Sequence, residues 1–280
     1  MSTSTSPVTA CVTGASGFLG SSVAVRFLEL GHKVRLPFRY QAQCDAWHAE
    51  YDDKYPGKLE TILLKKPMTE EGAFDEAVQG CDVVVHTASP LPGHFKREEA
   101  LAMPAEYAQV IYMAAKTFAE KAAWHVAPAA VIGKSRTPGV KSLKDTTVSF
   151  RQAWEGLFDQ KDFPMFCPEL FVSVDDVAYV HVEAALNASV SNGHRYLCSI
   201  QERYSWPQFS RALITYRPVL KSRLPQLPEQ PTEAEKPNAQ YRVESDLAEK
   251  HFGFVYEPFH VFAKAYADQV YELAKAEGIF

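Results

Sequence analysis

Hydrophobic and polar positions alternate with strand and helix periods from the start of the chain. Residues 8–12 (VTACV) form a short, β-branched apolar run of the kind that makes a buried parallel strand. Apolar positions then recur at helical spacing as far as Leu30, and Gly31 stands where a left-handed residue would end a helix. Residues 33–38 (KVRLPF) are predicted to form a second strand. The pattern therefore predicts a β-α-β unit.

The same alternation continues through the rest of the chain. Further strands are predicted at residues 59–64, 81–86, 171–174 and 196–198, with a brief extended piece at 131–133. Helices are predicted at residues 42–51, 72–78, 98–126, 148–158, 177–188, 205–214, 245–251 and 259–273. Strands that alternate with helices predict an α/β fold with a Rossmann-type, doubly wound, mostly parallel sheet and a small C-terminal lobe.

Local signals set some boundaries in the second half. Asp175 or Asp176 is predicted to cap the helix that starts at Val177. The stretch Ser205–Gln208 is a capping-box pattern with a proline in the first turn of the next helix. Residues 217–240 carry five prolines and few apolar side chains, so they are predicted to form a long loop.

Three glycines occupy the turn between the first strand and the first helix, in TGASGFLG at 13–20. A side chain at Gly14 or Gly17 would keep the backbone away from a pyrophosphate, and one at Gly20 would push helix and strand apart. The phosphates would meet free backbone N–H groups at the positive end of the helix dipole. The turn predicts a dinucleotide site. The alternative is a tight strand-to-helix turn without a ligand.

The end of the second predicted strand indicates which dinucleotide binds. NAD sites place an acidic residue there, about twenty positions past the glycines, to hold the ribose hydroxyls. This chain has Arg35 and Arg39 instead, with Arg39 nineteen positions after Gly20. A guanidinium at that strand tip can hold a 2′-phosphate in a bidentate fork, so NADP(H) is predicted. The alternative is a solvated surface arginine.

Tyr112 and Lys116 are the candidate catalytic pair. They lie four residues apart in the predicted helix at 98–126, so both side chains lie on one helix face. A lysine ammonium there favours the phenolate and lowers the pKa of the tyrosine. Such a tyrosine can donate a proton to a carbonyl oxygen as a hydride arrives, and the lysine can hold the nicotinamide ribose. The alternative is an exposed pair on an amphipathic helix.

Composition limits the partners and the cellular compartment that we expect for this protein. The chain has 280 residues, 46% of them hydrophobic, and a net charge of -5, which argues against nucleic acid or an anionic membrane as a partner. The N-terminus lacks the basic start and apolar core of a signal peptide, and no apolar run is long enough to span a bilayer. The five cysteines are scattered without metal or redox spacing. We therefore expect a cytoplasmic protein with reduced cysteines and no metal. Apart from the composition, we also expect a small-molecule carbonyl substrate and a monomer or homodimer.

Taken together, these motifs resemble the extended short-chain dehydrogenase/reductase family. The resemblance is to its dihydroflavonol-reductase-like branch, which includes fungal NADPH-dependent aldehyde and ketone reductases. The segments that carry it are TGASGFLG at 13–20, Arg39, GAFDEAV at 72–78, VVHTASP at 84–90, YMAAKTFAEKAAW at 112–124, FVSVDDVAYVHVEAAL at 171–186 and DLAEKHFGF at 246–254.

The resemblance implies roles for individual residues. Tyr112 would be the catalytic acid/base with Lys116 as its partner, and the C-terminal lobe would close over the substrate. The implied cofactor contacts are Gly14, Ser16, Gly17, Phe18, Leu19, Gly20, Arg39, Thr87, Ala88, Tyr112 and Lys116. We expect residues 1–186 to form the NADP-binding domain, with 134–170 partly a substrate loop, and residues 187–280 to form a smaller substrate lobe interleaved with it.

The centre of the chain departs from the family pattern. The family has a serine or threonine at the end of a fifth strand, but only twenty-two residues separate Ser89 from Tyr112 here. That is too few for a crossover, a strand and a further loop, so the fifth strand is predicted to be deleted and the sixth nearly so. The family's acidic residue near the adenine is replaced by Pro67 or a neighbouring lysine.

Ser89 or Thr87 could supply the missing hydroxyl, since both follow the fourth predicted strand; otherwise they are ordinary small residues beside the nicotinamide. His86 is interpreted as a packed or surface residue rather than an acid/base group. The predicted function is NADPH-dependent reduction of an aldehyde or ketone. The alternative is a redox-inactive relative: a pseudo-enzyme, a nucleotide-binding module, or an isomerase or cyclase that reuses the pocket.

Overall fold

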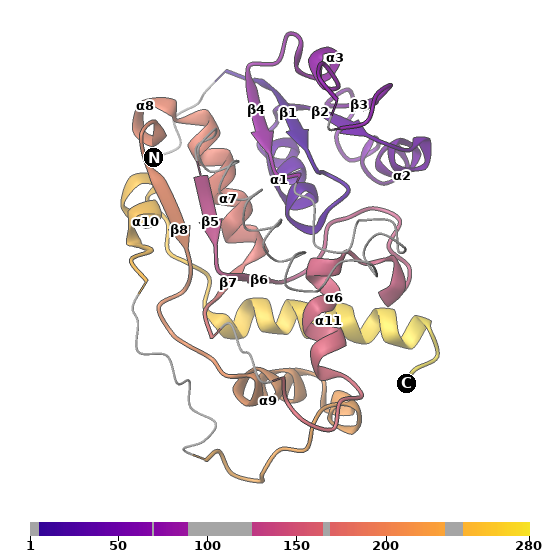
Figure 1. Cartoon of the computed structure of the whole chain (residues 1–280), viewed down its shortest axis with the longest axis vertical. Coiled ribbons are helices and arrows are strands. Elements are labelled where there is room, and N and C mark those ends of the chain that lie inside the picture. Colours follow the sequence, from indigo (N-terminus) through magenta and orange to yellow (C-terminus); the bar gives the residue numbers. More distant parts are fainter. Residues whose placement is uncertain (1–5, 69, 89–124, 165–168, 233–242) are drawn as a thin grey trace.

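The computed structural model describes residues 6–68, 70–88, 125–164, 169–232 and 243–280. Its first half is one parallel sheet with strand order β3-β2-β1-β4 (Figure 1). In the register, Cys11 lies opposite Arg35 of β2 and opposite Val84 of β4. The elements are β1 (Thr9–Thr13), α1 (Phe18–Glu29), β2 (Lys33–Phe38), α2 (Gln41–Tyr51), β3 (Leu59–Leu63), α3 (Asp75–Val78) and β4 (Val83–His86).

All seven of these elements were predicted from the sequence, with ends that differ from the observed ones by at most three residues. Ala10, Cys11 and Val12 of β1 are buried because helices and neighbouring strands surround this central strand. Gly31 has a φ of +81°, the left-handed conformation that ends α1 as expected. The predicted α/β fold class with a parallel sheet is confirmed.

The second half contains two short parallel strand pairs and most of the helices. β5 (His125–Pro128) pairs with β8 (Arg195–Cys198), and β6 (Ala130–Ile132) pairs with β7 (Phe171–Ser173). The remaining elements are η1 (Leu143–Asp145), α6 (Val148–Leu157), α7 (Val174–Leu186), α8 (Ala188–Ser191), α9 (Trp206–Tyr216), η2 (Pro218–Arg223), α10 (Asp246–Phe252) and α11 (Phe259–Ala276).

Two predictions for the centre of the chain were wrong. The helix predicted to run to residue 126 cannot do so, because residues 125 and 126 belong to β5. Pro128 disfavours helical backbone at Ala127, and β5 instead hydrogen-bonds to β8. The strand predicted to be nearly deleted is therefore present in two parts, with the change of partner at Ala129. The predicted deletion of the fifth strand, and most of the helix at 98–126, fall outside the described residues.

The start of α7 also differs from the prediction. The helix begins at Val174, three residues earlier than expected, and its cap is Ser173 rather than Asp175 or Asp176. The Ser173 hydroxyl accepts a hydrogen bond from the N–H of Asp175 at 3.2 Å. The two aspartates instead lie in the first turn, where their charge interacts favourably with the helix dipole.

The C-terminal predictions are largely confirmed. Ser205 and Gln208 form the predicted capping box of α9, and Gly253 ends α10 with a φ of +67°. The predicted loop at 217–240 is interrupted by the 3₁₀ helix η2, because Pro218 has a backbone angle suited to a first helical turn. The part of that loop beyond residue 232 is outside the described residues.

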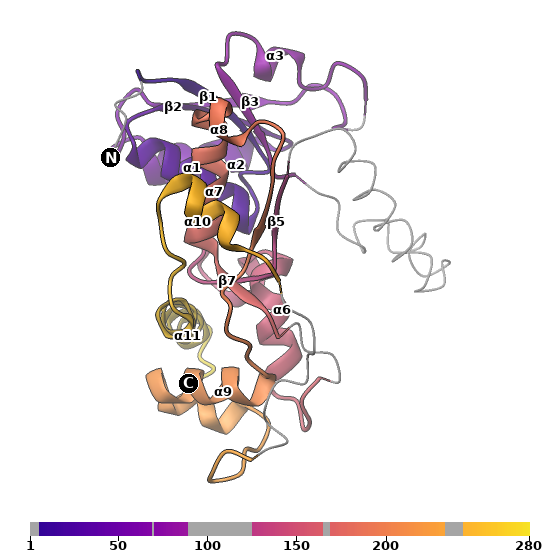
Figure 2. The same ribbon diagram turned by 90° about the vertical axis from the view of Figure 1, so that its left-hand side faces the viewer.

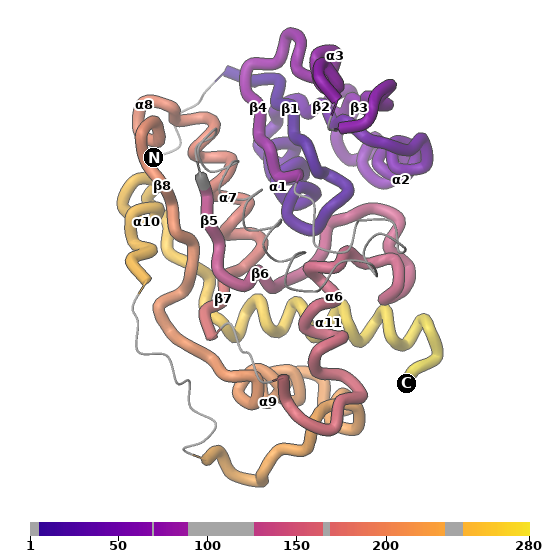
Figure 3. Tube along the Cα trace, viewed as in Figure 1, coloured from indigo at the N-terminus to yellow at the C-terminus, as the bar shows by residue number. Residues whose placement is uncertain are grey.

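α7 connects two hydrophobic clusters. Its Ala178 and Val182 pack with the sheet β1–β4 and α1, whereas Val174 and Val177 belong to the cluster around α6, α9 and α11. Figure 2 shows the resulting elongated shape, with the four-stranded sheet at one end and α9 at the other. The chain trace in Figure 3 follows α7 from β7 back towards that sheet. None of the helices in the described part of the chain is long and apolar enough to cross a membrane.

Candidate functional site

The glycine turn joins β1 to α1 at the carboxyl end of the sheet. Gly14 has a φ of +78°, and its carbonyl accepts a hydrogen bond from the N–H of Gly17 at 2.8 Å. α1 begins at Phe18, and no side chain caps it and no acidic residue lies in its first turn. The first N–H groups of α1 therefore have no side-chain cap among the described residues at the positive end of a twelve-residue helix, which is the arrangement that binds a phosphate.

Close packing explains the glycines at positions 14 and 20. A Cβ on Gly20 would lie 2.2 Å from the Gly14 carbonyl oxygen, and one on Gly14 would lie 2.6 Å from the Ala88 backbone nitrogen. At Gly17 the nearest atom would be 3.1 Å away. Gly14 and Gly20 are thus required by the packing of the chain itself, because the start of α1 and the end of β4 approach the turn closely.

The tips of β1 and β4 are joined by side-chain hydrogen bonds. The Thr87 hydroxyl donates to the carbonyl of Thr13 at 2.7 Å, and the Thr13 hydroxyl lies 2.8 Å from Nδ1 of His86. His86 is exposed and forms this hydrogen bond between two strands, in keeping with its interpretation as a packed or surface residue. Thr87, expected to line the cofactor, directs its hydroxyl into the protein backbone.

The two arginines of β2 and its tip differ in their surroundings. Arg35 is bound by Glu60, with Nε 2.9 Å from the carboxylate, and by the carbonyls of Ala77 and Gln79. Arg39 is exposed, and its guanidinium carbon lies 5.5 Å from the centre of the Tyr40 ring. The structure places no carboxylate within ion-pair distance of Arg39 in the described ranges. Of the two arginines, Arg39 is the one whose guanidinium group is available to bind a ligand.

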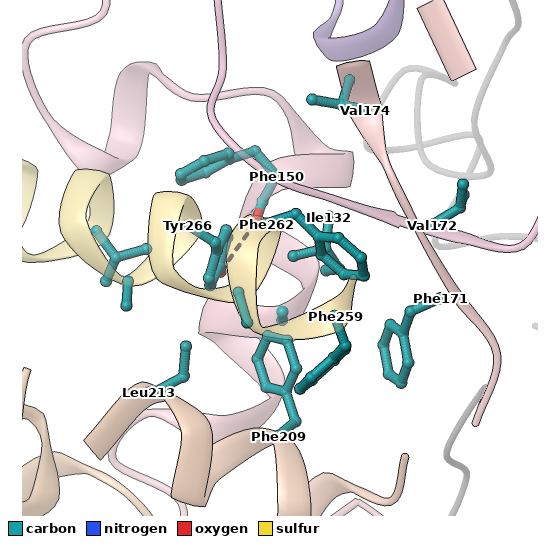
Figure 4. Close-up of a cluster of buried hydrophobic side chains, with 14 of the residues drawn as sticks. Ile132, Phe150, Phe171, Val172, Val174, Phe209, Leu213, Phe259, Phe262 and Tyr266 are labelled. Atoms are coloured by element: carbon teal, nitrogen blue, oxygen red, sulfur yellow. Dashed lines mark hydrogen bonds between the residues drawn. The ribbon is translucent and has the colours of Figure 1, made fainter. Parts of the chain in front are cut away.

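Phe18 connects the glycine turn to the second half of the molecule. Its ring packs edge-on against Phe150 of α6, with centroids 5.8 Å apart, and Phe150 packs against Tyr266 of α11 at 4.9 Å. The Tyr266 hydroxyl donates to the Phe150 carbonyl at 3.2 Å, which is the dashed line in Figure 4. The predicted amphipathic helices could have indicated Phe150 and Tyr266 as core residues, but not their contact with the turn.

The segment after β6 also reaches α1 and was not predicted to do so. The Thr137 hydroxyl lies 3.2 Å from that of Ser21, in the second turn of α1. The side chain of Gln269 bonds both backbone groups of Ser135, accepting at 2.7 Å and donating at 3.1 Å. No sequence signal pointed to these contacts, since each joins residues more than a hundred positions apart.

Three predicted site residues, Ser89, Tyr112 and Lys116, lie outside the described residues. The structure brings together the other predicted cofactor residues of the turn and of the tip of β4.

A cavity of about 280 Å³ lies between α1, α7 and residues 254–255, and none of the turn residues lines it. Arg136 lies at its edge between two carboxylates, 2.6 Å from Glu29 and 3.0 Å from Asp175. Asp176 is partly buried there and accepts a hydrogen bond from the Glu257 N–H at 2.7 Å. Burial raises the pKa of Asp176 to about 7, although that hydrogen bond opposes the shift.

Asp176→Asn is expected to stabilise the protein at pH 8. The raised pKa means that the folded chain binds more protons than the unfolded chain between about pH 4 and pH 7, so stability falls as the pH rises through that window. Asparagine retains an acceptor for the Glu257 N–H without the charge. We expect a gain of roughly 1–3 kcal/mol at pH 8 and a flatter pH profile in urea unfolding followed by circular dichroism.

The matched control is Asp175→Asn on the same helical turn. Asp175 is exposed and paired with Arg136, so its replacement should cost at most about 1 kcal/mol at either pH. An Asp176→Asn protein as pH-dependent as wild type would show that Asp176 is ionised normally in the folded state.

Comparison with known proteins places this geometry in a family. A model of the NAD dependent epimerase/dehydratase family matches residues 10–152, just over half of the chain. The chain belongs to this family. A dihydroflavonol 4-reductase from Callistephus chinensis is 43% identical over 96 residues, which are 34% of this chain and 26% of that protein. The match thus spans about a quarter of that relative's length, and the resemblance inferred from the motifs is confirmed.

The matches that cover most of the chain have lower sequence identity. Cinnamoyl-CoA reductase CAD2 from Medicago truncatula is 26% identical over 328 aligned positions, which cover 94% of this chain and 95% of that protein. Because the alignment is longer than the 280 residues of this chain, the relative has internal segments that this chain lacks. Yeast methylglyoxal/isovaleraldehyde reductase Gre2, solved with NADPH, has a TM-score of 0.76 at 18% identity over 97% of this chain and 100% of that chain. That likeness shows a shared fold.

Proposed function

We propose that the protein is an NADPH-dependent reductase of small aldehydes or ketones. The observation that carries the proposal is the start of α1 behind a glycine turn, together with the Arg39 guanidinium at the tip of the adjacent strand; among the described residues, no side chain caps α1 and no carboxylate pairs with Arg39. The names of the relatives support it, since the dihydroflavonol 4-reductase, the cinnamoyl-CoA reductase and Gre2 are all reductases, and Gre2 was solved with NADPH.

The chain's own residues fit this cofactor. The N–H groups at Phe18, Leu19 and Gly20 would bind the pyrophosphate, and Arg39 would bind the 2′-phosphate. When bound, NADPH supplies a hydride for the carbonyl carbon of a substrate. Tyr112 would donate a proton to the carbonyl oxygen, and Lys116 would favour the phenolate left behind. We further propose that residues 1–186 form the nucleotide domain and residues 187–280 a substrate lobe.

A second candidate function is nucleotide binding without redox chemistry. Two observations favour it. In the described part of the chain, β4 pairs only with β1 and β5 only with β8, so no described strand lies between β4 and β5. The longer alignment with the cinnamoyl-CoA reductase also indicates missing internal segments. If these include the strand with the family's substrate-binding hydroxyl, reduction would depend on Ser89, because the Thr87 hydroxyl already donates to the Thr13 carbonyl, or would be lost.

Binding and turnover distinguish the two functions. NADPH and NADH are titrated into the purified full chain by fluorescence, and NADPH oxidation is then followed by absorbance with a panel of aldehydes and ketones. Binding with turnover supports the reductase, and binding without turnover supports the redox-inactive function. An absence of binding to either nucleotide would refute both.

Arg39→Gln is expected to weaken NADPH binding about tenfold, because a charge-assisted bidentate contact with the 2′-phosphate is lost. NADH binding should stay within about twofold, since NADH lacks that phosphate. Arg223→Gln is the control: Arg223 is also a surface arginine, but it lies at the end of η2 and pairs with Asp159, just after α6. Equal losses for both nucleotides in Arg39→Gln would mean that Arg39 does not read the 2′-phosphate.

A further inference from the structure

We infer that Thr87 is a positioning residue of the glycine turn, acting on the cofactor through the backbone of Thr13 and Gly14 rather than by touching it. The inference rests on the proposed nucleotide site for its functional consequence, but its structural part stands on the contacts of Thr87 alone.

The only hydroxyl proton of Thr87 is already used. The hydroxyl donates to the Thr13 carbonyl at 2.7 Å, and the Thr87 N–H points to the same carbonyl at 3.3 Å. A threonine has one O–H donor, so none remains for a ligand. The side chain is partly buried at the junction of β4 with the turn.

The Thr87 oxygen also occupies the space that glycine leaves at two positions. It would lie 2.6 Å from a Cβ on Gly20 and 2.9 Å from a Cβ on Gly14. The hydroxyl is therefore enclosed by the tip of β1, the turn and the first turn of α1. A group in this place fixes three segments relative to one another because each of them packs directly on it.

A short series of backbone contacts links Thr87 to the phosphate-binding N–H groups. Thr87 fixes the carbonyl of Thr13, the residue before Gly14. The carbonyl of Gly14 in turn accepts the N–H of Gly17, the residue at the N-cap of α1. If the first link is lost, the start of α1 is free to shift, and donors that are aimed at a pyrophosphate lose their alignment.

Thr87→Val tests the inference, since valine keeps the shape and removes the hydroxyl. We expect binding of NADPH and of NADH to weaken by the same factor, about tenfold, because both share the pyrophosphate. Thr87→Ser should bind within about threefold of wild type, because it keeps the donor. Thr61→Val is the matched control: it also removes a threonine hydroxyl from the sheet, one bonded to His48 at 2.9 Å, far from the turn in sequence.

Amide hydrogen exchange in the nucleotide-free protein gives a second readout. The N–H groups of Gly17 and Ser21, bonded at 2.8 and 3.0 Å, should exchange about tenfold faster in Thr87→Val than in wild type or in Thr87→Ser. Thr61→Val should leave them unchanged. If Thr87→Val does not fold, Thr87→Ala removes the same hydroxyl without any steric conflict and is measured in its place.

The outcomes separate this inference from the proposed function. Wild-type affinity and wild-type exchange in Thr87→Val would overturn the inference. If the wild type binds neither nucleotide, the proposed function fails, but faster exchange at Gly17 confined to the variants without the hydroxyl would still support the structural role. A loss of affinity confined to NADPH would also contradict it, since that would indicate contact near the 2′-phosphate.

Discussion

Gly20→Ala is expected to weaken nucleotide binding roughly 100-fold or more and to lower the free energy of unfolding by about 1 kcal/mol. The added Cβ would meet the Gly14 carbonyl oxygen at 2.2 Å and the Thr87 hydroxyl oxygen at 2.6 Å. Atoms of a tight turn and of a strand tip cannot rotate away as a flexible side chain can. The start of α1 must therefore move by about an ångström, which disturbs every N–H group that would meet a phosphate.

Two opposing effects decide whether Gly20→Ala raises or lowers the free energy of unfolding. Alanine is a better helix former than glycine by about 1 kcal/mol, and Gly20 lies in the first turn of α1. Overpacking a rigid site typically costs roughly 1–3 kcal/mol, and the contact here is with backbone on one side. The steric cost should exceed the helical gain. For binding, a misplacement of this size is expected to cost roughly 100-fold or more in affinity.

Gly156→Ala is the matched control for this substitution. Gly156 is also helical, in α6, but the one described residue that a Cβ there would meet is Pro164, at an ordinary 3.6 Å. It should stabilise the protein by up to about 1 kcal/mol and leave NADPH binding unchanged. Thermal unfolding and fluorescence titration of both variants measure the contrast. A Gly20→Ala protein with wild-type stability and affinity would show that the turn is looser than the structure describes.

The sequence predicted the first half of the fold well for a physical reason. The strands β1 and β4 are nearly continuous apolar runs, and β1 is followed by a glycine turn and a helix with a clear period, so local pattern and global fold agree there. The left-handed Gly31 and the capping box at Ser205 are likewise local features that a few adjacent residues determine. The same holds for the glycine turn, whose residues are consecutive in the chain.

Features that depend on distant partners could not be predicted. His125 and Val126 are in a strand because β8, seventy residues later, pairs with them, and the helical sequence pattern before them gave no sign of it. Ser173 caps α7 because β7 ends at this residue. The sequence did not show where β7 ends, and the two aspartates that follow were equally good capping candidates. Whether Thr87 points to a ligand or to Thr13 depends on the spacing of two strand tips, and that spacing is set by the sheet register.

Phe150→Ala is expected to lower the free energy of unfolding by roughly 3–5 kcal/mol, a large part of what a typical domain has. Phe150 is 1% exposed and packs between Phe18 and Tyr266, so its removal leaves a cavity between the glycine turn and α11 (Figure 4). The bond from the Tyr266 hydroxyl survives, because its acceptor is the Phe150 backbone carbonyl. The loss is therefore one of apolar packing and is measured by urea unfolding.

A second effect distinguishes Phe150 from other core residues. Phe18 is the first residue of α1, so the ring that packs on it should help to hold the phosphate-binding end of the helix. Phe209→Ala is the matched control, because Phe209 is fully buried in the same cluster and packs on Tyr266, Phe171 and Phe259 rather than on Phe18. Both variants should lose similar stability, whereas only Phe150→Ala should weaken NADPH binding, by a few-fold, at a temperature where both remain folded. Equal affinities in the two variants would mean that the cluster supports the fold without bearing on the nucleotide site.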